Sequence, residues 1–235
     1  MNQSGPTLQR FADPERLADA LSERLVLGLR AAIAARGTAS LIVSGGKTPL
    51  PLFERLAVTD LGWRQVKIAL ADERWVALED EGSNERFVRE HLLHGHAAAA
   101  SFVGLKNDAP SAARGAVAAW RAVAKLARPF DVMLLGMGDD GHTASLFPDS
   151  PNLSKALDPD AAPGCVATRS PVAPQERITL NCAALLDARD IIVSSTGETK
   201  WRVYEEALSE GPVEDMPIRA IFRQTRTPVA FFWAP

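Results

Sequence analysis

The chain has 235 residues, 46% of them hydrophobic and 23% charged, which is typical of a soluble globular protein with a sizeable core. The net charge is −3 and no run is rich in Lys or Arg, so the composition excludes a strongly basic surface for nucleic acid. No apolar segment reaches the ~18 residues that a membrane span needs, and the two cysteines, Cys165 and Cys182, show no metal-type spacing and fit a reducing compartment.

The first quarter of the chain predicts a helix, a strand and a second helix. Asp13-Pro14 is a typical helix start, because aspartate caps the first turn and proline fits its first position. Leucines then recur at every fourth position, and Gly37 is placed to end the helix. The apolar run 41–43 predicts a strand that breaks into 44–48, and Thr48-Pro49 begins the next helix.

The same alternation continues to the end of the chain, and only 148–175, which is rich in proline, is predicted to be mainly loop. Strands that alternate with helices predict a mostly parallel sheet covered on both faces. The length fits one α/β domain over residues 1–235 better than two small ones. The remaining strands are expected at 66–71, 131–135, 178–180, 190–193 and 229–233, and the remaining helices at 83–93, 112–126 and 196–208.

Polar clusters follow four of the predicted strands, at 44–48, 72–75, 136–143 and 196–200. In open α/β sheets, ligands bind beyond the carboxyl ends of the strands. We therefore expect the four clusters to form one composite site.

The cluster 44–48 reads Ser-Gly-Gly-Lys-Thr at a strand-to-helix junction, where backbone N–H groups and the positive helix end suit a phosphate. A nucleotide-triphosphate loop needs glycine where Leu41 stands, so that function is excluded. A plain tight turn is the alternative. The run 136–141 matches GxGxxG, but Pro148 and Pro151 interrupt the helix that a dinucleotide site requires, so we reject that interpretation as well.

His142 directly follows the glycine-rich turn, beside Asp139 and Asp140. A lone histidine is often structural, but a carboxylate neighbour in the expected ligand zone favours a general base. No carboxylate or cysteine spacing supports a metal site, and we expect a surface position for the other three histidines, His91, His94 and His96.

Strand-end charges supply the other candidates. Asp72 and Arg74 form either a simple salt bridge or a pair in which Arg74 faces an oxyanion or phosphate and Asp72 faces sugar hydroxyls. Arg169, Arg177 and Lys200 are further candidate cations, each of which is otherwise a solvated charge.

Taken together, these motifs resemble the 6-phosphogluconolactonase branch of the glucosamine-6-phosphate isomerase/6-phosphogluconolactonase family. The resemblance implies a three-layer α/β/α Rossmann-like sheet and no cofactor, and the lack of zinc-type spacing predicts that no metal is needed. It also implies hydrolysis of 6-phospho-D-glucono-1,5-lactone, the second step of the oxidative pentose phosphate pathway. The matching blocks are SGGKTP (44–49), DERWV (72–76), SN (83–84), FDVMLLGMGDDGHTASLFP (130–148), RITLN (177–181) and TGETK (196–200).

The resemblance also assigns roles. His142 is the expected base, Arg74 stabilises the oxyanion or contacts the substrate, and Asp140 and Asp72 orient His142 or bind hydroxyls. The remaining substrate-binding and phosphate-binding candidates are Ser44, Gly45, Gly46, Lys47, Asn84 and Lys200, with one or both of Arg169 and Arg177.

The chain departs from the family pattern at Val172, where a lysine is common, so one phosphate contact is absent or replaced. The rival deaminase branch has a glutamate five residues beyond the histidine, where this chain has Phe147, and a tyrosine where it has Arg74. A non-catalytic sugar-phosphate sensor is a second alternative. Such sensors usually carry a basic DNA-binding extension, and this chain has neither the extra length nor the positive charge that we expect of one.

The first thirty residues contain four carboxylates and read as neither a signal nor a transit peptide. We therefore expect a cytoplasmic enzyme whose partner is a phosphorylated sugar lactone. Nothing in the sequence indicates nucleic acid, membrane or an obligate partner protein.

Overall fold

In the computed structural model, which describes residues 5–46 and 48–235, seven strands form a parallel sheet in the order β1-β10-β9-β6-β2-β3-β5. The order places β6 between β2 and β9, so the carboxyl ends of these three strands lie side by side. The strands are β1 (Thr7–Arg10), β2 (Ala39–Val43), β3 (Val66–Leu70), β5 (Ser101–Val103), β6 (Val132–Leu135), β9 (Ile191–Thr196) and β10 (Val229–Ala234).

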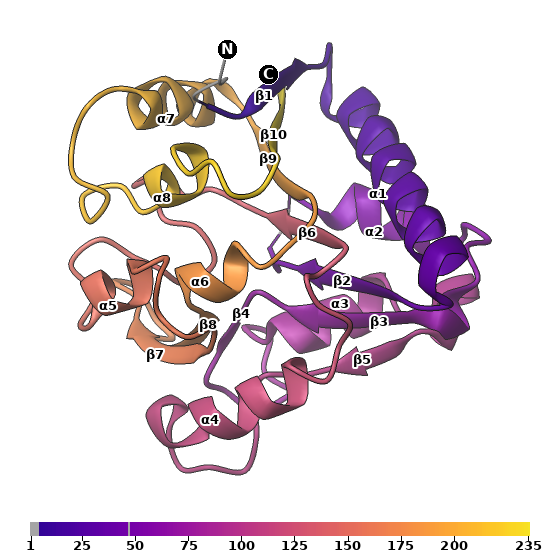
Figure 1. The fold of residues 1–235 in the computed structure, drawn as a ribbon, viewed down its shortest axis with the longest axis horizontal. Helices are drawn as coiled ribbons and strands as arrows, with labels where there is room; N and C mark the ends of the chain where they lie inside the picture. The colour runs from indigo at the N-terminus through magenta and orange to yellow at the C-terminus, as the bar shows by residue number, and fades with distance from the viewer. Residues whose placement is uncertain (1–4, 47) are drawn as a thin grey trace.

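Helices cover both faces of this sheet. Figure 1 shows α1 and α2 on one side, and α7 and α8 on the other. This arrangement confirms the predicted three-layer α/β/α fold with a mostly parallel sheet. The helices are α1 (Pro14–Arg36), α2 (Leu50–Ala57), α3 (Asn84–His91), α4 (Ala112–Val123), α5 (Leu153–Leu157), α6 (Cys182–Leu185), α7 (Glu198–Leu208) and α8 (Ile218–Phe222), with 3-10 turns at Trp63–Gln65 and Gly95–Ala99.

Helix α1 begins and ends where the sequence predicted. The Asp13 side chain accepts the backbone N–H of Arg16 at 2.8 Å, and Gly37 closes the helix with a φ of 72° that suits glycine. The leucine face of α1 is buried against the sheet. Every residue of β2 and β6 is buried too, because helices cover the central strands from both sides. No helix of the described residues is both long and apolar enough to cross a membrane.

A second, antiparallel sheet of three strands adjoins the first. It consists of β4 (Asp72–Arg74), β8 (Glu176–Leu180) and β7 (Cys165–Arg169), in that order. The sequence placed 72–74 at the end of the strand that begins at 66. In the structure the chain leaves the main sheet after Ala71, whose carbonyl accepts the N–H of Leu180, so that 72–74 pairs with β8 instead.

The region 148–175 was predicted to be loop, yet it contains α5 and β7. Local patterning did not reveal β7, because its pairing partner β8 lies beyond a proline-rich loop. The edge strands β1 and β5 were also missed. Neither shows the buried and exposed alternation that identifies a half-buried strand.

Candidate active site

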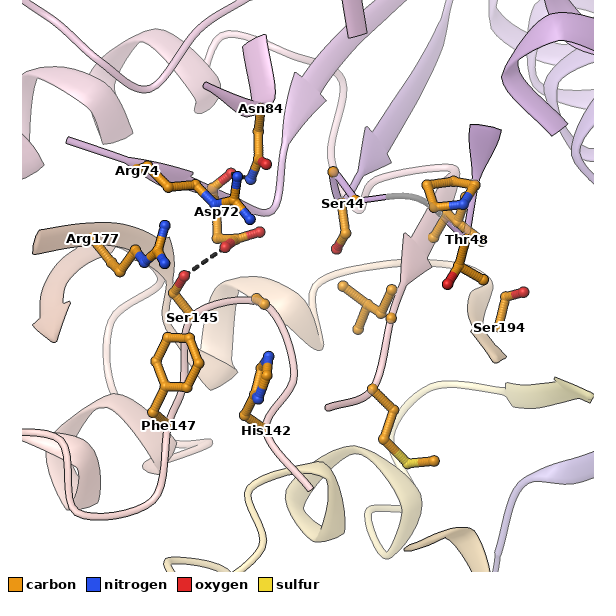
Figure 2. Close-up of a pocket in the computed structure, with 18 of the residues that line it drawn as sticks. Ser44, Thr48, Asp72, Arg74, Asn84, His142, Ser145, Phe147, Arg177 and Ser194 are labelled. Carbon is orange, nitrogen blue, oxygen red and sulfur yellow. Dashed lines mark hydrogen bonds between the residues drawn. The ribbon is translucent and has the colours of Figure 1, made fainter. Parts of the chain in front are cut away.

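A cavity of about 250 Å³ lies at the carboxyl edge of the main sheet, where it meets the second sheet. Each of the four polar clusters contributes lining residues: 44–46 and Thr48, Asp72 and Arg74, 136–137 and His142, and Lys200. Figure 2 shows Ser44, Asp72, Arg74 and His142 facing one space, although they come from segments that are far apart in the sequence. The fold thus gathers the strand-end clusters around one space.

His142 and Asp140 form a hydrogen-bonded pair in the turn after β6. Nδ1 of His142 lies 2.5 Å from Oδ1 of Asp140, which also accepts the His142 backbone N–H at 3.0 Å. Burial raises the pKa of Asp140, but the hydrogen bonds and charge of His142 outweigh burial and bring it below its usual range. Asp140 is therefore a carboxylate at neutral pH. With Nδ1 engaged by Asp140, Nε2 is the nitrogen available as a base in the cavity.

The glycine-rich turn makes room for this pair. A Cβ on Gly138 would lie 2.0 Å from Nδ1 of His142 and 2.5 Å from Oδ1 of Asp140. No larger residue fits there unless the pair moves. The following residues, 142–152, form turns and not the helix that a dinucleotide site needs. Within the GxGxxG run, Gly138 therefore serves the packing of His142.

Asp72 is buried at the start of β4. Its Oδ2 accepts the hydroxyl of Ser145 at 2.5 Å, and its backbone carbonyl accepts Nδ2 of Asn84 at 2.9 Å. Ser145 lines the cavity, although it was not among the residues predicted from the sequence. The available signal was its place three residues after His142, inside the most specific motif. These bonds hold the Asp72 carboxylate between Arg74 and Ser145 (Figure 2).

Glu73 is a second residue of the site that was not predicted from the sequence. It is 1% exposed and accepts the backbone N–H groups of Arg74, Asn84 and Glu85, each at 2.7 Å. Burial raises the pKa of its carboxyl, while these three hydrogen bonds partly offset the rise. Asn84 and Glu85 are the first two residues of α3, so these bonds connect the start of that helix to β4. They also fix the positions of two residues that line the cavity, Arg74 and Asn84.

Two arginines lie next to each other in one wall, because the β4–β8 register places Arg74 opposite Arg177. Arg177 is 4% exposed, and its Nε and Nη1 have no hydrogen-bond partner in the part of the chain that the structure describes. Burial and, to a smaller extent, repulsion from Arg74 lower the pKa of Arg177 to about 10. The guanidinium therefore stays charged at neutral pH. A buried cation with unused donors is uncommon and indicates a site for an anion.

Lys200, in the first turn of α7, is the third cation among the described residues that line the cavity. Its Nζ lies 2.7 Å from Asp139, and its side chain is 23% exposed. Beyond the end of β2, Gly45 packs so closely on Asn84 that a Cβ would lie 2.1 Å from Oδ1 of that side chain. Ser44, Gly45 and Gly46 all line the cavity, whereas Lys47 lies outside the described residues.

Arg169 was predicted as a candidate phosphate ligand, but it does not line the cavity. It is exposed at the end of β7, where its guanidinium contacts Gln175. Of the two arginines near the proline-rich loop, the fold brings only Arg177 to the site.

The remaining histidines lie away from this cavity. His94 and His96 are exposed as predicted, whereas His91 is half-buried and packs on Phe87 with ring centroids 4.6 Å apart. Among residues 5–46 and 48–235, no group of three His, Cys, Asp or Glu side chains is arranged to hold a metal ion.

The sequence pattern of the glucosamine-6-phosphate isomerases/6-phosphogluconolactonase family matches residues 12–232. The chain belongs to this family. It is similar to the 6-phosphogluconolactonase of Rhizobium meliloti, with 42% identity over 225 residues that cover 96% of this chain and 97% of the relative.

Solved structures agree. A 6-phosphogluconolactonase from Shewanella baltica superposes with a TM-score of 0.95 at 46% identity, covering 100% of both chains. A monomeric glucosamine-6-phosphate deaminase superposes with a TM-score of 0.79 over 97% of both chains. At 15% identity this second likeness shows the shared fold alone. The two branches of the family must therefore be told apart by their site residues.

Proposed function

We propose that this chain hydrolyses 6-phospho-D-glucono-1,5-lactone to 6-phospho-D-gluconate, the second step of the oxidative pentose phosphate pathway. The observation that carries the proposal is the His142–Asp140 pair, which leaves Nε2 available in a cavity that Arg74, Arg177 and Lys200 also line. Relatives named 6-phosphogluconolactonase that match nearly the whole chain support it.

The reaction follows from these groups. A water molecule attacks C1 of the lactone while Nε2 of His142 takes its proton, and the carbonyl electrons move onto oxygen to give a tetrahedral oxyanion. Arg74 stabilises this negative charge. When the intermediate collapses, the bond between C1 and the ring oxygen breaks. The imidazolium of His142 then protonates the departing ring oxygen, and the product is a hydroxy acid.

The lactone substrate brings a phosphate with close to two negative charges. The donors for it are the 44–46 loop, Lys200 and the unused N–H groups of Arg177. Asp72 and Asn84, which line the cavity beside Arg74, bind the sugar hydroxyls. This chain has Val172 at a position where the family commonly has a lysine, and Arg177 and Lys200 supply positive charge instead.

The deaminase alternative is disfavoured at Phe147. This residue occupies the position of the deaminase glutamate, is buried, and packs on His142 with ring centroids 4.3 Å apart. An aromatic ring cannot carry the proton that a carboxylate relay would handle. The isomerising reaction would therefore lack one of its groups, whereas ester hydrolysis needs only a base and an oxyanion donor.

A coupled assay with freshly made 6-phosphogluconolactone tests the proposal, with the uncatalysed rate subtracted. We expect turnover well above spontaneous hydrolysis. Binding without acceleration would identify a sensor, and release of ammonia from glucosamine 6-phosphate would identify a deaminase.

A further inference from the structure

Three serine hydroxyls of the described residues are buried without a hydrogen-bond partner: those of Ser44, Ser194 and Ser195. Buried hydroxyls are almost always bonded, so each needs an explanation. Ser44 and Ser194 line the cavity, whereas Ser195 does not. The mechanism above uses Ser44 but leaves Ser194 without a role.

The sheet register shows why Ser194 faces the cavity. Leu135 of β6 pairs with Val193 of β9, so Ser194 is level with Gly136 in the neighbouring chain segment. A Cβ added to Gly136 would meet no atom of the described residues within 4 Å, so they leave space beside Ser194. Ser194 is 7% exposed, and Figure 2 shows it on the same side of the cavity as Thr48.

The groups around this part of the cavity are mainly donors. The 44–46 loop follows the end of β2, which is separated from β9 only by β6, and Lys200 lies in the helix that β9 leads into. The carboxylate of Asp72 belongs instead to the group around Arg74 (Figure 2). Asp139 also lies here, but its carboxylate is already paired with Lys200. A hydroxyl in such a setting suits an oxyanion better than a sugar hydroxyl.

We propose that the hydroxyl of Ser194 donates a hydrogen bond to the phosphate of the substrate, beside Ser44 and Lys200. Ser194 then contributes to the preference for phosphorylated over unphosphorylated lactones. This inference rests on the proposed function for the identity of the substrate, but the phosphate contact itself can be measured independently of catalysis.

The neighbouring residue provides a matched control. Ser195 is on the same strand, is 2% exposed and has an equally unpartnered hydroxyl. Successive side chains of a strand point to opposite faces, so Ser195 points away from the face that Ser194 presents to the cavity. Each of the variants Ser194→Ala and Ser195→Ala therefore removes a buried hydroxyl oxygen. Only the hydroxyl of Ser194 faces the site.

The experiment compares both variants with the unaltered chain. We measure kcat/KM for 6-phosphogluconolactone and for glucono-1,5-lactone, together with the affinity for inorganic phosphate. Ser194→Ala should lower kcat/KM for the phosphorylated lactone and the phosphate affinity about 10-fold, the effect of a hydrogen bond to a charged group. The unphosphorylated lactone should be affected much less, and Ser195→Ala should leave all three values close to those of the unaltered chain.

Equal losses on both lactones, no loss at all, or equal effects of the two variants would overturn the inference. If Ser194→Ala does not fold, Ser194→Cys keeps the size with a weaker donor and carries the same expectation. If the unaltered chain does not hydrolyse the lactone, but Ser194→Ala still lowers the affinity for inorganic phosphate, the proposed function fails and the phosphate contact stands. If the unaltered chain hydrolyses the lactone, but Ser194→Ala does not change the phosphate affinity, the proposed function stands and the contact with Ser194 is rejected.

Discussion

Asp140 and His142 are joined twice, because one carboxylate oxygen accepts the backbone N–H of His142 at 3.0 Å and lies 2.5 Å from its ring Nδ1. The two residues are only two positions apart, so a single turn fixes both the position and the orientation of the imidazole. This local arrangement gives the proposed base a defined tautomer before any substrate binds.

His142→Ala should lower kcat by about 10²–10⁴-fold and leave the affinity for 6-phosphogluconate nearly intact, because a general base acts mainly in the transition state. Steady-state kinetics and a product-binding titration measure the two effects. The exposed His96 provides the control, since His96→Ala should change neither. A His142 variant with close to full kcat would remove this residue from the mechanism.

Asp140→Asn should lower kcat by less than His142→Ala does and should move the acid limb of the pH–rate profile to lower pH. Because the pKa of Asp140 is held below its usual range, the residue remains negatively charged near neutrality and stabilises a protonated neighbour. The neutral amide removes this negative charge from beside the imidazole, so the acid limb moves to lower pH. An acid limb that stays in place would show that Asp140 does not act through His142.

Arg177→Met should raise KM for the phosphorylated lactone about 10-fold or more and leave Tm unchanged or slightly higher. The substitution removes a buried charge whose unused donors contribute nothing until an anion binds. Arg169→Met, at an exposed position outside the cavity, should leave the kinetics unchanged. A large fall in Tm for Arg177→Met, with normal KM, would assign Arg177 a structural role instead.

Gly138→Ala should reduce kcat strongly while the chain still folds, because the new methyl group would displace the His142 ring. Gly164→Ala is the control, since its Cβ would make only ordinary contacts, the nearest at 3.8 Å. Circular dichroism establishes folding, and the lactone assay measures kcat. Normal turnover by Gly138→Ala would mean that the turn adjusts without moving the base.

Turnover should survive exhaustive chelation, with the metal content measured in the same sample. The proposed base, His142, and the proposed oxyanion donor, Arg74, are sufficient for ester hydrolysis without a Lewis acid. Loss of activity that added zinc restores would require a metal-activated water and would reassign His142 and Asp140 as ligands.

The sequence alone was sufficient for features that depend on nearby residues. The start and end of α1 could be predicted because the Asp13 cap and the Gly37 turn act within a few positions. The closeness of His142 to a carboxylate could be predicted for the same reason, because Asp140 lies in the same turn and within the most specific motif of the chain.

Only the tertiary structure decided which distant groups meet. Ser145 and Asp72 are 73 positions apart, and their hydrogen bond exists because β4 leaves the main sheet to pair with β8. That pairing also brings Arg177 to the cavity, while Arg169 remains exposed at the end of β7. Side chains alternate between the faces of a strand, so register determines which of them reaches the site, and register between distant strands depends on the packing of the whole fold.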